Sequence, residues 1–213
     1  HNRKKISFSC MLKDYWFLMT HKEFMLLSTI PNLFVTAYLA FLGNAAFYYI
    51  NSCKLSYFDY GIHQGFIVMS FSLMSFYANK VVNKFGSKKA VNFGLGCYTI
   101  GILLLSYSAF VFPFEPKLIT LSMCILSVGA AFPMSVTFAQ SLDVVPMLRG
   151  ASSSFIMSSR LFISSFAIAM TGVFFDGSMK PVTLIYCIVL VLVFCMYFIV
   201  NSKYPKEEVS TSY

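Results

Sequence analysis

Long stretches without charged residues divide the chain into six segments. Residues 24–53, 60–79, 90–114, 118–142 and 181–202 contain no Asp, Glu, Lys or Arg, and 150–175 contains only Arg160. Each stretch is long enough to cross about 30 Å of hydrocarbon, which takes about 20 helical residues. The pattern therefore predicts six transmembrane segments, at about 24–50, 60–79, 90–112, 118–142, 150–175 and 182–201.

The six segments are expected to be helices. Backbone groups in lipid must find their partners within the protein, which leaves helices or a closed barrel. A barrel strand alternates apolar and polar residues over about 10 positions, whereas residues 184–200 are apolar without alternation. We predict an all-α membrane bundle over 24–201, with a basic segment at 1–23 before it and a tail at 202–213 after it.

The composition and the distribution of charge also indicate a bilayer. Of the 213 residues, 58% are hydrophobic and 11% are charged, which is far from the composition of a soluble domain. When the segments are placed in order, twelve of the 16 Lys and Arg lie on one side, three lie on the other, and Arg160 lies in the membrane. The positive-inside rule then predicts that both termini are cytoplasmic.

The basic loops and the cysteines point to no further class of ligand. The net charge of +8 comes from the loops, and no basic patch is interleaved with aromatic residues, so nucleic-acid binding is not expected. The six cysteines form no CxxC pair and four lie inside the segments, so we expect neither a metal site nor a disulfide framework. No cofactor is expected. No signal peptide is visible, and the first residue, His1, indicates a fragment or a processed product.

Residues 150–175 carry the most informative polar pattern. At 100° per residue, Ser153, Arg160, Ser164 and Thr171 fall within about 40° of one another and form one stripe. Arg160 is 11 residues from Arg149, or about 16 Å along the axis, which places it near the midplane. A central arginine costs at least about 2.5–3.5 kcal/mol unless it meets water or an acid, and no acid of the chain is suitably placed. Two interpretations stay open: hydrogen bonding inside the bundle, or a cavity-lining charge that binds a substrate, a coupling carboxylate or another polypeptide.

Four further polar side chains are candidates for a transport cavity: Asn44, Tyr48, Gln64 and Gln140. Asn44 and Tyr48 are four residues apart and share one helical face. For all four side chains, hydrogen bonds between helices explain their presence as well as contact with a substrate does.

Two segments are apolar on nearly every face. Residues 182–201 have few polar side chains, and 90–112 is similar. Such helices have much of their circumference against lipid, so we expect both at the periphery of the bundle. Gly94, Gly96 and Gly101 offer close backbone approach to a neighbouring helix.

A short basic link at 80–89 joins the second and third segments. The sequence NKVVNKFGSKK, residues 79–89, resembles the second, degenerate copy of the signature loop of the major facilitator superfamily, G-x-x-x-D-R-x-G-R-[RK]. The positions that correspond are Asn79, Asn83, Lys84, Gly86, Lys88 and Lys89. Glycine permits a tight turn, and the basic residues hold the loop on the cytoplasmic face. Because Asn83 replaces the Asp of the pattern, the carboxylate that the family uses for charge interactions is absent.

The resemblance extends over most of the chain. Six segments, two cytoplasmic ends and GxxxP at 129–133 match helices seven to twelve, the C-terminal half of such a transporter. Residues 48–89 and 144–159 look most like bacterial drug:proton antiporters of the bicyclomycin and chloramphenicol resistance type. The resemblance implies proton-coupled efflux of drugs or other small molecules across a bacterial inner membrane. It also implies that an N-terminal six-helix half is needed as a partner, because substrate binds between two halves.

The sequence gives little support to an enzyme or a channel. An intramembrane serine protease needs a histidine beside its nucleophile, but His63 lies at the outer edge of its segment and no GxSxG occurs. No TVGYG filter, paired Asn-Pro-Ala or acidic ring is present. Two alternatives to efflux stay open: an uptake symporter for a small metabolite or osmolyte, and an inactive fragment of a decayed transporter gene. Since no segment contains an acid, H⁺ coupling would have to reside in the other half.

Overall fold

The computed structural model describes residues 8–203, which form helices joined by short links. The elements in chain order are α1 (Phe8–Thr20), α2 (Lys22–Ala46), the π-helix η1 (Phe47–Ser52), α3 (Tyr57–Phe85), α4 (Ser87–Val111), α5 (Pro116–Val144), the 3₁₀ turn η2 (Pro146–Leu148), α6 (Arg149–Val173) and α7 (Lys180–Lys203). Within these residues, six helices are long and apolar enough to cross a membrane, with η1 continuing α2 and η2 preceding α6. The predicted all-α fold with six spans is confirmed.

The helices extend beyond the charge-free stretches, which corrects the predicted links. The link expected at 80–89 is helical: α3 continues to Phe85 and α4 begins at Ser87, with only Gly86 between them. Likewise the segment expected at 1–23 contains α1 and the start of α2. Long basic side chains at a helix end reach water while the backbone keeps its helical hydrogen bonds, so the first charged residue marks the edge of the hydrocarbon and not the end of the helix.

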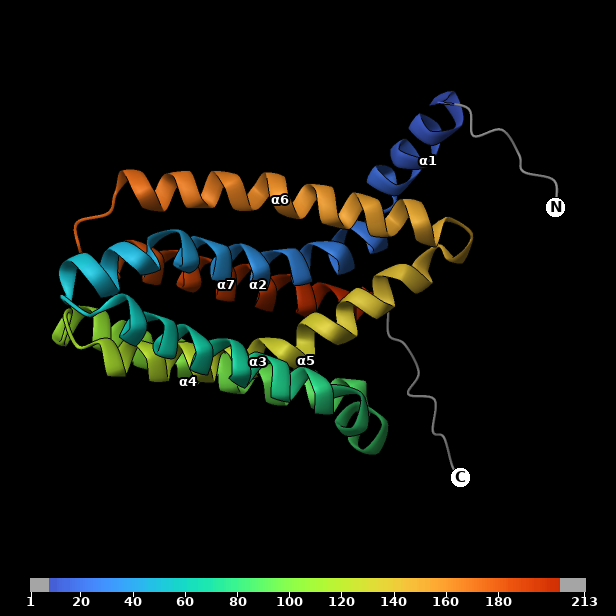
Figure 1. The fold of residues 1–213 in the computed structure, drawn as a ribbon. Coiled ribbons are helices and arrows are strands. Elements are labelled where there is room, and N and C mark those ends of the chain that lie inside the picture. The colour runs from blue at the N-terminus through green and yellow to red at the C-terminus, as the bar shows by residue number, and fades with distance from the viewer. Residues whose placement is uncertain (1–7, 204–213) are drawn as a thin grey trace.

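The spanning helices run up and down, so successive links lie at opposite ends of the bundle (Figure 1). One end carries α1, the α3–α4 turn, η2 and the end of α7, and the other carries the α2–α3, α4–α5 and α6–α7 links. Of the described residues, Lys22, Lys84 and Arg149 are basic residues that the sequence assigns to the cytoplasm, and they lie at the first end. The orientation of this end in a cell stays a prediction.

Helices α2 and α5 form the centre of the bundle. They pack on each other and are the most buried of the six, whereas α3 and α6 are the least buried. Helix α2 also contacts α6 and α7, and α5 contacts α3 and α4. The two sets of three helices, α2 to α4 and α5 to α7, make equivalent contacts. If the sets are exchanged in order, the contact of α2 with α6 corresponds to that of α5 with α3, and the contact of α2 with α7 corresponds to that of α5 with α4. Because each set has three spanning helices, the second set crosses the bundle in the opposite direction (Figure 1).

Glycines bring α4 and α5 together. A Cβ built on Gly94 would lie 2.6 Å from Cδ of Pro133 and 2.7 Å from the carbonyl oxygen of Gly129. A Cβ on Gly101 would lie 2.7 Å from Cγ of Leu126, whereas one on Gly96 would meet nothing within 4 Å. The predicted close approach is thus confirmed for Gly94 and Gly101, but not for Gly96.

Candidate functional site

A seam of buried polar side chains joins α2 to α6 through the depth of the bundle. Nearest to α1, Asn32 contacts α6. One turn further, the hydroxyl oxygens of Thr36 and Ser164 are hydrogen-bonded at 3.1 Å. Toward the opposite end, Nδ2 of Asn44 donates to Oγ1 of Thr171 at 2.8 Å. Both helices start at the same end of the bundle (Figure 1), so the two polar stripes stay in register.

Arg160 lies at the Asn32 end of this seam. Its Nε donates to Oδ1 of Asn32 at 3.1 Å. The amide nitrogen of Asn32 donates in turn to the carbonyl oxygen of Ile156 at 3.1 Å and to Oγ of Ser159 at 3.0 Å. Asn32 is 2% exposed, so its amide is held in one orientation and holds the guanidinium. The hydrogen-bonding interpretation of Arg160 therefore applies to Nε, and within residues 8–203 no ion pair involves its Nη1 or Nη2.

The other predicted cavity residues are distributed over several helices. Ser153 is partly buried on α6, and Gln140 is partly buried on α5. Tyr48 is fully buried in η1, where its ring packs edge-on against Tyr49 with centroids 5.1 Å apart. On α3, Nε2 of Gln64 reaches only the hydroxyl of a tyrosine one turn earlier, at 3.5 Å. The hydrogen-bonded seam thus includes Asn44, Arg160 and Ser164. The other four predicted residues lie outside it, namely Tyr48, Gln64, Gln140 and Ser153, and a common transport cavity stays a prediction.

A separate cavity of about 200 Å³ lies among α2, α3, α4, α5 and α7. Aromatic and aliphatic side chains line it, among them Phe34, Tyr38, Phe71, Tyr98, Met134 and Tyr186. None of the seven predicted cavity residues lines this space. Because Tyr98 of α4 and Tyr186 of α7 are buried and face it, the expectation that these two helices are peripheral does not hold for their inner faces.

A hydrogen-bonded network at the opposite end from α1 joins η1, α3 and α5. The hydroxyl of Tyr49 is 2.6 Å from Oγ1 of Thr120, and Nδ1 of His63 is 2.7 Å from the same oxygen. The Tyr49 and His63 rings stack with centroids 5.1 Å apart. Since Oγ1 of Thr120 also donates to the carbonyl oxygen of Pro116 at 2.8 Å, the network ties three elements together.

The residues that resemble a signature loop lie at the junction of α3 and α4. Gly86 has φ 86°, a left-handed value that favours glycine, and this residue alone separates the two helices. The other five residues that correspond to the signature loop are exposed: Asn79, Asn83, Lys84, Lys88 and Lys89. The sharp turn expected of the glycine is therefore present, although its flanks are helical.

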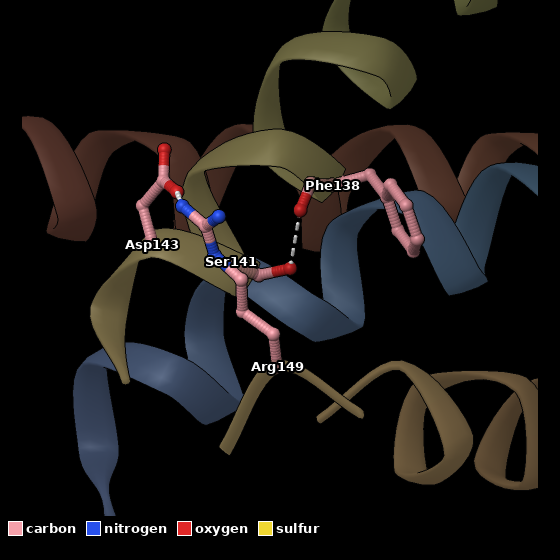
Figure 2. Close-up of polar contacts among 4 residues, drawn as sticks. All are labelled: Phe138, Ser141, Asp143 and Arg149. Atoms are coloured by element: carbon pink, nitrogen blue, oxygen red, sulfur yellow. Dashed lines mark hydrogen bonds and ion pairs between the residues drawn. The ribbon is translucent and has the colours of Figure 1, made fainter. Parts of the chain in front are cut away.

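An ion pair closes the neighbouring junction between α5 and α6 (Figure 2). Nη2 of Arg149 donates to Oδ1 of Asp143 at 2.6 Å, and both side chains are more than half exposed. Two residues before Asp143 in α5, Oγ of Ser141 donates to the carbonyl oxygen of Phe138 at 2.7 Å. Exposed pairs of this kind contribute about 0.2–1 kcal/mol, so the contact stabilises the turn only locally.

Sequence reasoning missed the partner of Arg160 and most of the cavity lining. Asn32 and Thr36 did carry a signal, because they are polar, four residues apart and inside a charge-free stretch. The cavity tyrosines carried none, since Tyr98 and Tyr186 stand in segments that are apolar on nearly every face, and nothing in a single sequence distinguishes a buried tyrosine from a lipid-facing one.

Comparison with known proteins assigns no family to this chain. No protein family matches the sequence, and no curated protein is significantly similar to it. The apolar helices themselves establish the class: this is a multi-span, all-α membrane protein.

Proposed function

We propose that the chain is a six-helix unit of a secondary active transporter of the major facilitator type. The observation that carries the proposal is that the helices α2 to α4 and the helices α5 to α7 make equivalent contacts while they cross the bundle in opposite directions. Such 3+3 inverted repeats occur within each six-helix half of major facilitator transporters. The resemblance of residues 79–89 to the family's signature loop points to the same class.

The exposure of the helices supports a second six-helix unit as the partner. Helices α3 and α6 pack on the central pair α5 and α2, yet they are the least buried of the six. Helix α6 also carries Arg160 at mid-depth, where a charge facing lipid is strongly disfavoured. A second unit that covers this side would enclose a cavity near the midplane, and rocking of the two units would expose it to each side of the membrane in turn.

The proposed direction is efflux of drugs or other small molecules, coupled to H⁺ across a bacterial inner membrane. None of the six predicted segments contains an acid that could carry the proton, so the coupling group belongs to the second unit. Uptake of a small metabolite or osmolyte by symport uses the same architecture and is the second candidate.

Accumulation of a labelled drug in cells tests the proposal. Cells that produce the protein together with the second six-helix unit should accumulate less chloramphenicol, a neutral drug, or less nalidixate, an aromatic carboxylate, than cells that produce the second unit alone. An uncoupler should abolish the difference, because H⁺ coupling drives efflux. The matched variants are Arg160→Ala, which should reduce the difference, and Ser165→Ala, an exposed hydroxyl on the same helix, which should not.

Three outcomes contradict parts of the proposal. Energy-dependent gain of a solute in place of drug loss favours the uptake symporter. No change in any solute favours an inactive fragment. Saturable, uncoupler-sensitive transport by the purified, monomeric chain shows that no second unit is needed.

A further inference from the structure

The guanidinium of Arg160 uses only part of its hydrogen-bonding capacity within the described chain. Nε is engaged with Asn32 at 3.1 Å, and Asn32 is itself fixed by two bonds to α6. An arginine carries five N–H donors, so the four on Nη1 and Nη2 remain for another partner. The group is therefore positioned but unsatisfied.

The acids nearest in sequence to the span ends do not complete this interaction. Asp143 pairs with Arg149, Asp176 accepts two hydrogen bonds from Ser178, and Asp59 accepts one from a neighbouring serine. All three lie at helix ends, whereas Arg160 lies about 16 Å from the start of α6. The ion pair found within residues 8–203 joins Arg149 and Asp143, so no acid of this part of the chain forms an ion pair with Arg160.

We propose that Arg160, positioned by Asn32, binds the carboxylate of a small, largely apolar molecule at mid-depth of the membrane. A planar guanidinium with two adjacent N–H groups matches a carboxylate in a bidentate pair, and pairing is what allows such a charge to stay at this depth. Met157, one turn before Arg160, is 43% exposed and offers an apolar contact for the body of the ligand. The inference rests on the proposed transport function and names aromatic or aliphatic carboxylates as its substrate class.

The low arginine content of the chain permits a direct test. The sequence contains three arginines, Arg3, Arg149 and Arg160. In the full chain labelled with ¹⁵N-arginine and placed in lipid nanodiscs, the Nε–H signals can be assigned with Arg149→Lys and Arg160→Lys. Benzoate should shift the Arg160 signal saturably, and benzamide, its neutral counterpart, should not. The Arg149 signal, which reports an exposed ion pair, serves as the internal control.

Asn32 acts as a positioning residue and has its own variant. Asn32→Ala should weaken benzoate binding about tenfold, because the guanidinium of Arg160 is no longer held by a charge-assisted hydrogen bond. Thr29→Ala, on the same helix, removes only a hydroxyl that donates to the carbonyl oxygen of Met25 and should leave binding unchanged. A merely structural role of Asn32 would alter the melting temperature without altering the affinity for benzoate.

The outcomes separate this site from the proposed function. An Arg160 signal that ignores benzoate, or that moves equally with benzamide, overturns the site even if cells show drug efflux. A shift that follows protein concentration instead of benzoate also overturns it, because the carboxylate then comes from another copy of the chain. Saturable benzoate binding at Arg160 in a protein that moves no solute leaves the site standing and removes the transport function.

Discussion

Replacing Gly129 by alanine tests whether the packing of α4 on α5 requires a glycine. The added Cβ would meet the backbone nitrogen of Tyr98, and it would lie 2.7 Å from Cα of Tyr98 and 2.8 Å from the carbonyl oxygen of Gly94. All three neighbours are backbone atoms, so no rotation of a side chain can relieve the overlap. Helix α4 would have to move away from α5.

The expected loss follows from two opposing effects. Overpacking of a tight interface costs about 1–3 kcal/mol. The cost here should lie at the upper end of that range, because the added Cβ contacts backbone atoms of both Tyr98 and Gly94. Alanine has a better helix propensity than glycine, which returns at most about 1 kcal/mol. We therefore expect Gly129→Ala to lower the free energy of unfolding by about 1–2 kcal/mol net.

The free energy of unfolding can be measured by titrating the purified chain in mixed micelles with sodium dodecyl sulfate and following its helical circular dichroism. Gly96→Ala is the matched control, because this glycine lies on α4 and an added Cβ there meets nothing within 4 Å. The control should be neutral or more stable by up to about 1 kcal/mol. If Gly129→Ala unfolds at the same detergent fraction as Gly96→Ala, the argument from backbone contact is wrong.

Three further predictions concern other parts of the fold. A double-mutant cycle with Asn44→Ala and Thr171→Val should give a coupling energy of about 0.6 kcal/mol, and at most about 1.7 kcal/mol, the range of hydrogen bonds between membrane helices. A coupling energy of zero in the same micelle titration would show that this hydrogen bond does not stabilise the packing of α2 on α6. Tyr98→Phe should leave the free energy of unfolding unchanged or raise it by about 1 kcal/mol, since the buried hydroxyl has no hydrogen-bond partner within the described chain, whereas Tyr98→Ala should lower it by about 3–5 kcal/mol. The hydroxyl and the backbone N–H of Ser178 donate to the Asp176 carboxylate and hold its pKa below the usual value of 3.8. Because the folded pKa lies below the unfolded one, this stabilisation is complete above the unfolded pKa and is lost as pH falls through the folded pKa. Asp176→Asn should therefore flatten the fall in melting temperature as the pH drops from about 5 through the folded-state pKa of Asp176, and an unchanged acid slope would contradict the role of this carboxylate.

The sequence predicted the spans well because hydrocarbon thickness acts on each helix separately. A stretch such as 118–142 has to be apolar over about 20 residues whatever it packs against, and α5 covers it. Helix ends were predicted less well. The predicted second segment ended before Lys80, yet Lys80 and Lys84 both continue α3, because a lysine outside the hydrocarbon does not interrupt helical hydrogen bonds.

The candidate site could be predicted only in part. The stripe of Arg160, Ser164 and Thr171 follows from helical periodicity within α6, and the structure does direct Ser164 and Thr171 toward α2. Asn44 of α2 was also predicted as a candidate, but the pairing of the two helices was not predictable. Asn32 and Thr36 are more than 120 residues away in sequence from their partners, and nothing local to α6 specifies which helix it meets.

The sequence by itself determined the class of this protein and the number and order of its spanning helices, because each of these depends on the solubility of one segment in lipid. Only the tertiary structure decided which helices are central, that three helices repeat in the opposite direction, and that Asn32 holds the guanidinium. The physical reason is that lipid is as apolar as the helices, so burial of apolar surface does not select helix partners. That selection comes from close glycine contacts and a few buried hydrogen bonds, which exist only when the helices are assembled.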